Sequence, residues 1–230
     1  MSGGGDSRAK ILGSIRQSLQ GASHLPPAPQ VTLPPPEAPD GGMAERFAAE
    51  LTKVSGTVLS LPAGRVAGWL LGLMAERQAA DLLSWQAADL PVPGLLEALR
   101  AGGIRLVDTV LPHAEPGRSV ALERVEKVTF GLTGADAAFA DTGTLALTAG
   151  PGRPRLASLS VRTHVALLDP RCLYPSWAAW LAAEGSGVAQ RLAGASNLTL
   201  ITGPSRTGDI EMTLTVGVHG PGELIVVLVS

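Results

Sequence analysis

Apolar residues recur at helical spacing in several segments of the chain. In residues 8–20 they fall on one side of a helix while Arg and Lys side chains occupy the other, which predicts a short amphipathic helix. The same spacing predicts helices over 43–54 and 63–77. Shorter helices are expected over 93–100 and 175–184.

Short apolar runs between these segments are typical of strands. They lie at 56–61, 79–83, 104–108, 127–132, 143–148, 164–169, 197–202 and 223–229. Strands that alternate with helices predict an α/β fold, with an open, mostly parallel sheet flanked by helices. The last run, LIVVLVS, is apolar throughout and predicts a central strand covered on both faces.

Prolines crowd the segment from Leu25 to Gly42. Because proline lacks a backbone N–H and fixes φ, this composition predicts an extended linker. We therefore divide the chain into 1–42, an N-terminal amphipathic helix on a Pro-rich linker, and 43–230, one α/β domain. The apolar side of the helix needs another surface, either its own domain, a sister subunit or a partner. The alternative is a loosely docked helix without function.

Composition narrows the class of protein. Hydrophobic residues make up 45% of the chain and charged residues 17%, which is enough to bury a core. A net charge of −2 offers no basic excess for nucleic acid. Without a long apolar run or a secretion signal, we expect a cytoplasmic protein. The one cysteine, Cys172, cannot form an internal disulfide or hold an iron–sulfur cluster by itself.

Residues 202–211, TGPSRTGDIE, gather polar groups directly after an apolar strand. Gly203 and Pro204 predict a turn at the carboxyl end of that strand, where open α/β sheets bind ligands. Free backbone N–H groups and a guanidinium suit a carboxylate or phosphate. The candidate ligand-binding residues here are Gly203, Ser205, Arg206 and Thr207.

An internal role for the same side chains stays open. Ser205 or Thr207 would then cap a helix, and Arg206 would pair with Asp209 or Glu211. These two carboxylates share a face only if the segment is a strand, because on a helix they point about 200° apart.

Two further clusters carry candidate chemistry. His219 lies among glycines in VGVHGPG, where small neighbours leave the imidazole accessible as a general base or carboxylate binder, unless it only bonds a carbonyl in the turn. In 131–147, a short helical turn is expected at 135–140, followed by Asp141 and Thr142 at the entry of a strand. The alternative for Asp141 is a local turn hydrogen bond. His164 belongs to a scattered basic set with Arg153, Arg155 and Arg162.

Together these segments resemble the LUD domain family, and within it the C-type lactate utilization branch. The residues that carry the resemblance are 134–138 with 140–144, then 203–211, then 217–221, in that order. GPSRTGDIE is the most specific, and the resemblance covers about 43–230. Two positions depart from the family pattern: Asp141 stands where Glu is usual, and Arg162-Thr163 stand shortly before His164 where Pro is frequent.

The resemblance implies a fold similar to the NagB/RpiA/CoA-transferase-like group. It also implies a place in a three-part system that oxidises L-lactate to pyruvate, with cysteine-rich iron–sulfur proteins as partners. The clusters are then expected in the partner subunits, with no cofactor or metal in this chain. A stand-alone enzyme on a phosphorylated, folate or CoA-like substrate, a non-catalytic scaffold subunit and a homo-oligomer remain open.

These observations combine into one spatial prediction. The arginine-bearing turn and the histidine turn should line one hollow that binds a small anionic metabolite. We expect proton handling by His219, Asp209 or Glu211. Ligand contacts are expected from Gly203, Ser205, Arg206, Thr207, Asp141, Thr142 and His164.

Overall fold

The structure is a computed structural model that describes residues 4–20, 42–208 and 214–230. Its internal contacts divide the chain into two units, Met1–Pro34 and Pro35–Ser230. In the first unit, α1 spans Gly4–Leu19, and Ile11, Ile15 and Leu19 on it are exposed. The predicted N-terminal helix is therefore confirmed, whereas most of the predicted linker lies outside the described residues.

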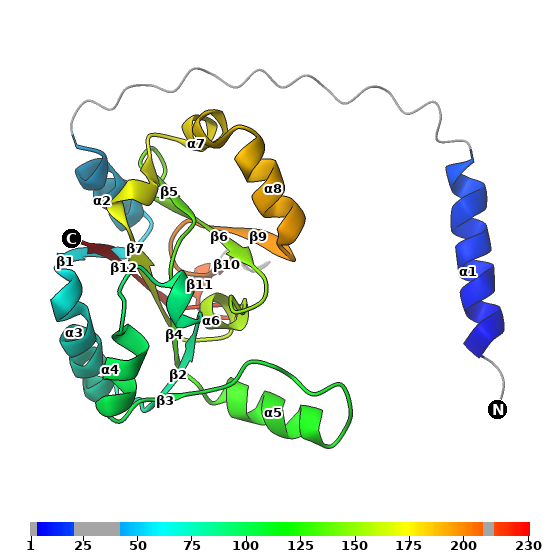
Figure 1. The fold of residues 1–230 in the computed structure, drawn as a ribbon, viewed down its shortest axis with the longest axis horizontal. Coiled ribbons are helices and arrows are strands. Elements are labelled where there is room, and N and C mark those ends of the chain that lie inside the picture. Colours follow the sequence, from blue (N-terminus) through cyan, green and yellow to red (C-terminus); the bar gives the residue numbers. More distant parts are fainter. Residues whose placement is uncertain (1–3, 21–41, 209–213) are drawn as a thin grey trace. The chain divides into compact units, whose positions relative to one another are not determined.

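A six-stranded parallel sheet forms the centre of the second unit (Figure 1). Every neighbouring pair of strands in it runs parallel, in the order β1-β12-β7-β4-β2-β3. The apolar C-terminal run is an interior strand, as its pattern predicts. In sheet order the strands are Thr57–Leu61, Glu223–Val229, Thr163–Leu168, Phe130–Thr133, Asp81–Ser84 and Arg105–Leu106.

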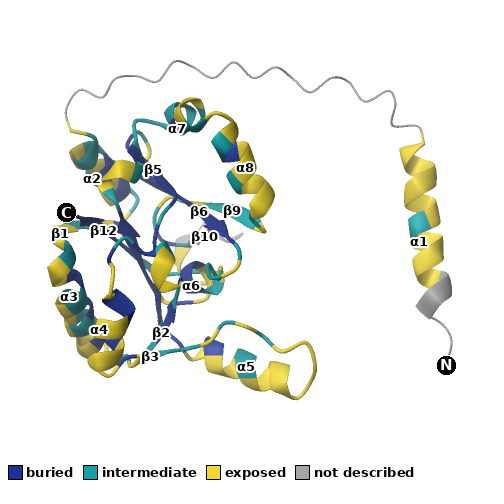
Figure 2. Ribbon diagram, viewed as in Figure 1, coloured by how far each residue is buried: buried dark blue, intermediate teal, exposed yellow. Residues whose placement is uncertain are grey.

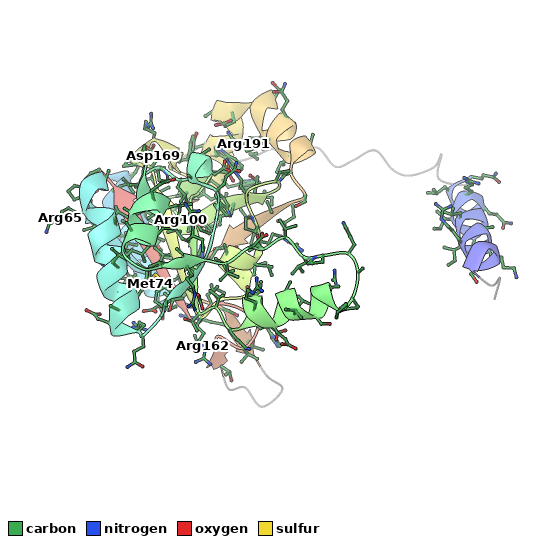
Figure 3. The ribbon with its side chains drawn as sticks, turned by 60° about the horizontal axis from the view of Figure 1, so that its bottom comes forward. Arg65, Met74, Arg100, Arg162, Asp169 and Arg191 are labelled. Carbon is green, nitrogen blue, oxygen red and sulfur yellow. The ribbon has the colours of Figure 1, made fainter. Side chains whose placement is uncertain are left out.

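Helices cover this sheet with apolar residues spaced one turn apart. Val66, Leu70 and Met74 of α3 are fully buried, while Arg65 projects outward from the same helix (Figure 3). Helices α3 and α4 lie on one face, and the short α6 contacts β4 and β7 on the other (Figure 1). The helices of this unit, α2 to α8, are Met43–Lys53, Ala63–Glu76, Leu95–Ala101, Gly117–Glu126, Leu156–Leu159, Trp177–Glu184 and Ser186–Gly194.

A four-stranded sheet, in the order β8-β5-β6-β9, packs beside the first. Its strands are Leu173–Tyr174, Ala137–Phe139, Thr144–Ala149 and Asn197–Ile201. After β9 comes a two-stranded hairpin of β10, Arg206–Gly208, and β11, Leu214–Val216. The α/β prediction with an open, mostly parallel main sheet is confirmed, and the second sheet adds antiparallel pairs to it.

The structure corrects one local prediction and decides against one alternative. Residues 135–140 do not form a helical turn, because Ala137–Phe139 is strand β5, which pairs with β6 on one side and β8 on the other. No helix begins at 206–208 either, since Thr207 pairs with Thr215 in the β10–β11 hairpin. In both places hydrogen bonds to neighbouring strands of a sheet outweigh local helix preference.

Buried side chains form a continuous core between the layers (Figure 2). A separate aromatic cluster holds the second sheet to α7, where Trp180 lies 5.8 Å from Phe139 and 5.2 Å from Trp177 between ring centroids. Ser176 begins α7 by accepting a hydrogen bond from the Ala179 N–H at 3.1 Å. This cluster, with Tyr174, holds half of the aromatic residues of the chain, and the others pack in the main core.

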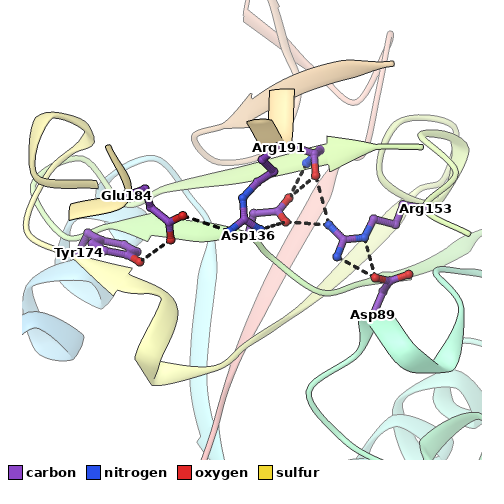
Figure 4. A network of polar contacts seen from close by, with 7 residues as sticks. Asp89, Asp136, Arg153, Tyr174, Glu184 and Arg191 are labelled. Atoms are coloured by element: carbon purple, nitrogen blue, oxygen red, sulfur yellow. Dashed lines mark hydrogen bonds and ion pairs between the residues drawn. The ribbon is translucent and has the colours of Figure 1, made fainter. Parts of the chain in front are cut away.

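A buried carboxylate links the segments around the second sheet. Asp136, whose side chain is 2% exposed, accepts hydrogen bonds from the backbone N–H and the hydroxyl of Thr148 at 2.6 and 2.8 Å. Its other oxygen accepts from Arg153 at 2.7 Å and Arg191 at 3.3 Å (Figure 4). Both arginines therefore converge on one carboxylate oxygen.

The same arginines extend the network outward. Arg153 pairs with Asp89 at 2.7 Å and lies over the Trp85 ring, 4.9 Å from its centroid. Arg191 pairs with Glu184 at 3.3 Å, and Glu184 accepts from the Tyr174 hydroxyl at 3.4 Å (Figure 4). The network thus ties the loop after β6 and helix α8 to the loop after β4.

Candidate ligand-binding site

The two glycine-rich turns singled out in the sequence meet through their backbones. The Ser205 N–H donates to the Pro221 carbonyl at 2.8 Å, and the Gly217 N–H donates to the Ser205 carbonyl at 2.9 Å. A side chain at Gly220 would lie 3.1 Å from Cβ of Ser205, so the small residue permits this approach. The predicted convergence of the two turns is therefore seen in the structure.

Gly203 has a conformational role in the first turn. Its φ is +86°, and a Cβ atom there would lie 2.7 Å from the carbonyl oxygen of Val54. An L-residue would be strained by the backbone angle and would also crowd the turn between α2 and β1. Glycine at this position lets the chain leave β9 and present Ser205 toward Pro221.

A cavity of about 210 Å³ lies beside these turns. It is enclosed by α6, by β9 with the turn after it, and by the amino ends of β7 and β12. The predicted residues Gly203, Ser205, His164 and His219 all line it. The complete lining is Ser158, Leu159, His164, Thr199, Leu200, Ile201, Thr202, Gly203, Ser205, His219, Gly220, Pro221 and Leu224.

His164 is the fully buried polar group of this cavity. It lies in β7 opposite Gly131 of β4 and Leu224 of β12, and its Nε2 is 2.9 Å from the Thr133 hydroxyl. Its Nδ1 has no hydrogen-bond partner among the described residues. Burial lowers the pKa of His164 to about 3, so the ring is neutral at physiological pH.

This buried histidine makes the stability of the protein depend on pH. The pKa of His164 is about 3 in the folded chain against 6.5 for a free histidine, so between these values the unfolded chain binds the extra proton. Stability should therefore fall as pH drops through this window, by about 1.4 kcal/mol per pH unit from this group. Urea unfolding of His164→Gln between pH 7 and 4 should show a shallower loss than the parent protein. The same experiment on His113→Gln, an exposed histidine, should keep the parent slope; equal slopes for all three proteins would refute the assignment.

His219 provides the accessible imidazole at the same cavity. It is exposed, in the turn between β11 and β12, while the neighbouring Gly220 and Pro221 are half-buried. Because it lines the cavity yet faces solvent, its ring is accessible both to a ligand and to water. The cavity lining thus contains one buried, neutral histidine in β7 and one exposed histidine in the turn before the neighbouring strand β12.

Arg206 lies outside the cavity lining. Its side chain is exposed, and its guanidinium donates to the Ser55 hydroxyl at 2.8 Å. Ser55 itself has a φ of +67°, at the turn where α2 leads into β1. Thr207 is half-buried in the hairpin and also does not line the cavity. Asp209 and Glu211 lie outside the described residues.

Asp141 and Thr142 are connected to the cavity through other hydroxyls. Neither lines it, but the Thr142 hydroxyl donates to Asp141 at 3.2 Å and accepts from Thr144 at 2.8 Å. The Thr144 hydroxyl lies 2.8 Å from that of Thr202, which lines the cavity. A local turn bond at Asp141 is therefore present, and a longer chain continues from it.

A family model named LUD domain matches residues 44–229. The chain belongs to the LUD domain family. The expected family is thereby confirmed over nearly all of the second unit, and the cavity described above lies wholly within the matched LUD domain.

Curated relatives of this LUD domain carry one recurring name. "Lactate utilization protein C" of Halalkalibacterium halodurans is 30% identical over 178 residues, which is 75% of this chain and 72% of that one. A protein of the same name from an Exiguobacterium species is 36% identical over 115 residues, 50% of this chain and 48% of that one. The similarity to the second relative thus covers about half of its length.

A solved structure shares the fold. A DUF162 family protein from Deinococcus radiodurans aligns with a TM-score of 0.57 at 19% identity and covers 82% of this chain and 96% of that one. At this identity the likeness concerns the fold alone. It agrees with the α/β arrangement of the LUD domain found here.

A second cavity in the LUD domain lies at the usual ligand edge of a parallel sheet. It measures about 460 Å³ and lies past the carboxyl ends of β2 and β3, with Ser84, Gln86, Arg100 and Asp108 in its lining. Within residues 4–20, 42–208 and 214–230, His, Cys, Asp and Glu side chains form no group of three or more suited to a metal ion. No helix in that part of the chain is both long and apolar enough to cross a membrane.

Sequence reasoning missed several cavity residues of the LUD domain. Thr202 lines the cavity directly after the last residue of β9. Thr133 ends β4 and does not line the cavity, but its hydroxyl lies 2.9 Å from Nε2 of His164, which does. Ser158 and Leu159 belong to α6, which is too short to show a helical pattern. Only the contiguous polar run after β9 offered a signal, and Thr202 is its first residue.

Proposed function

We propose that this chain is the C-type component of a lactate utilization system that oxidises L-lactate to pyruvate, and that it binds a small anionic metabolite in the cavity beside Ser205 and His219. One observation carries the metabolic assignment: a relative named "Lactate utilization protein C" aligns with 75% of this chain over 72% of its own length. The matched family model supports the same assignment.

The proposed partners are cysteine-rich iron–sulfur subunits that carry the electrons. Cys172 is the one cysteine of these 230 residues, and a cluster needs several cysteine ligands. Burial is the main cause that raises the pKa of the Cys172 thiol, which disfavours the thiolate that ligates metals. The proposed division of labour therefore places the clusters in the partners and the small ligand here.

The cavity favours a small ligand. Its volume of about 210 Å³ equals roughly seven water molecules at about 30 Å³ each, and lies below the roughly 300 Å³ at which pockets for drug-sized ligands begin. Within this proposal, Ser205 donates to the ligand and His219 binds its carboxylate or moves a proton. Arg206, next in the chain to Ser205, would exchange its bond to Ser55 for the ligand carboxylate. Asp209 and Glu211 remain proposed proton carriers.

The metabolic part can be tested genetically. Deleting the gene should abolish growth on L-lactate as sole carbon source and leave growth on pyruvate unchanged, because only the oxidation step is lost. Complementation with the intact gene should restore growth, and the tagged protein should co-purify with cysteine-rich iron–sulfur proteins. A deletion strain that grows normally on L-lactate would remove the assignment.

The ligand site can be tested on the isolated protein. Titration calorimetry with L-lactate and pyruvate should show binding that His219→Ala weakens about tenfold, as expected for the loss of one hydrogen bond to a charged group. His113→Ala, which removes an exposed histidine elsewhere, should leave affinity unchanged. Thermal stabilisation by sugar phosphates, folates or CoA but by neither of these acids would instead favour the stand-alone enzyme.

A further inference from the structure

A line of hydroxyl groups leads from a surface carboxylate to the cavity. Thr142 Oγ1 lies 3.2 Å from Asp141 Oδ1, Thr144 Oγ1 lies 2.8 Å from Thr142 Oγ1, and Thr202 Oγ1 lies 2.8 Å from Thr144 Oγ1. Thr144 is buried, and Thr202 lines the cavity. The line joins the entry of β6 to the end of β9, which are neighbouring strands of the second sheet.

The carboxylate fixes the direction of every hydrogen bond in this line. An ionised carboxylate only accepts, whereas each hydroxyl has one proton to donate. Thr142 therefore donates to Asp141, Thr144 donates to Thr142, and Thr202 must give its proton to Thr144. As a result, Thr202 Oγ1 has only lone pairs left for a further partner at the cavity.

His164 is a second lining residue of this cavity with an unused hydrogen-bonding atom. Its side chain is fully buried, it lines the cavity, and its Nδ1 lacks a partner among the described residues. A buried nitrogen without a partner costs free energy that a bound polar group would recover. The ring is neutral, so it contributes a hydrogen bond and no charge.

We propose that the cavity selects the hydroxyl form of its small ligand over the carbonyl form, and thus a 2-hydroxy acid over the matching 2-oxo acid. The ligand hydroxyl donates to Thr202, whose own proton is committed to Thr144. A ketone oxygen in the same place would face the lone pairs of Thr202 and offer them no proton, so Thr202 would keep only its hydrogen bond to Thr144. Asp141, Thr142 and Thr144 are positioning residues that set the polarity of Thr202. This inference rests on the proposed ligand site.

The selectivity follows from how polar pockets discriminate. Thr202 is exposed in the free protein, so the discrimination requires that the bound ligand exclude water from its hydroxyl. A site that then receives a hydroxyl proton rejects an analogue lacking the proton far more strongly than an apolar pocket separates similar shapes. An acid and its keto counterpart have the same carboxylate and nearly the same size, so charge and volume do not separate them. The feature of this cavity that distinguishes the two acids is the Thr202 hydroxyl, which donates to Thr144 and can only accept from a ligand.

Titration calorimetry on the full chain tests the proposal with L-lactate and pyruvate as probes. L-lactate should bind at least about tenfold more tightly than pyruvate. Thr202→Val, which keeps the shape and removes the hydroxyl, should bring the ratio of the two dissociation constants close to one, mainly through weaker L-lactate binding. Thr202→Ser should restore the preference.

Asp141→Asn tests the direction in which the hydroxyl groups of Thr202, Thr144 and Thr142 donate their hydrogen bonds. The amide can donate to Thr142 and so permits the reversed chain, in which Thr202 donates into the cavity. The preference for L-lactate should fall and pyruvate affinity should rise. Asp169→Asn, at a carboxylate paired with Arg171, should leave the ratio unchanged.

The outcomes separate this inference from the proposed function. The proposed selectivity is overturned if both acids bind equally well. It is also overturned if the preference for L-lactate persists in both Thr202→Val and Asp141→Asn. In either case the proposed ligand site itself is retained. Binding of neither acid overturns both. Thermal melting of each variant identifies any loss of fold, and the Thr202→Ser rescue keeps the test decisive if Thr202→Val is unstable.

Discussion

Replacing Asp136 by Asn is expected to lower the free energy of unfolding by about 3 to 5 kcal/mol, the usual cost of removing one partner from a buried ion pair. The carboxylate is 2% exposed and accepts from Thr148, Arg153 and Arg191. Asparagine keeps the size but directs two N–H donors toward groups that also donate. The arginines would then share a buried site without the charge that both contact.

Urea unfolding followed by circular dichroism measures this effect. The matched control is Asp81→Asn, which breaks the pair between Asp81 and exposed Arg105 at 2.7 Å. Since exposed ion pairs contribute little, its unfolding midpoint should stay close to that of the parent protein. Similar midpoints for the two variants would show that the network around Asp136 is not a stabilising centre.

The network of Asp136 marks a limit of sequence reasoning. The sequence predicts a role for Asp141, the more exposed carboxylate, and contains Asp136 only within a segment that resembles the LUD family. The partners Arg153 and Arg191 come from a loop and a helix 17 and 55 positions away. These ion pairs depend on how the second sheet packs, so local sequence patterns do not predict them.

The main sheet was predictable chiefly through its interior strands β4, β7 and β12, which are buried along nearly their whole length. Continuous apolar runs such as 223–229 are unambiguous, and all the expected main-sheet strands appear, although β3 is reduced to Arg105–Leu106. The second sheet was harder, because β5 is alanine-rich and becomes a strand only through pairing with β6 and β8. Helix α5 has almost no apolar side and was missed for that reason.

The site was predictable where its residues are contiguous in the chain. Glycine and proline mark the turns at 203–205 and 217–222, and these do meet at one cavity. The direction of Arg206 could not be predicted, because its partner Ser55 lies 151 positions earlier. The catalytic and ligand-binding roles given to these residues stay predictions until binding is measured.

Gly131→Ala is expected to be the most damaging substitution of a glycine near the cavity. Gly131 is buried in β4, and an added Cβ would overlap the carbonyl group of Ala157 in α6. Because that atom belongs to the backbone, the helix must move as a whole, with an expected loss of about 3 kcal/mol of stability. Differential scanning calorimetry and urea unfolding measure the loss.

The matched control is Gly72→Ala in α3, where an added methyl group meets nothing within 4 Å. Alanine there should raise stability by about 0.5 to 1 kcal/mol, because glycine inside a helix is unfavourable. Replacing glycine by alanine is thus expected to lower the free energy of unfolding at Gly131 and to raise it at Gly72.

Since α6 supplies Ser158 and Leu159 to the cavity lining, Gly131→Ala should also weaken ligand binding under conditions where the protein stays folded. Unchanged affinity in the folded variant would mean that the position of α6 does not shape the site.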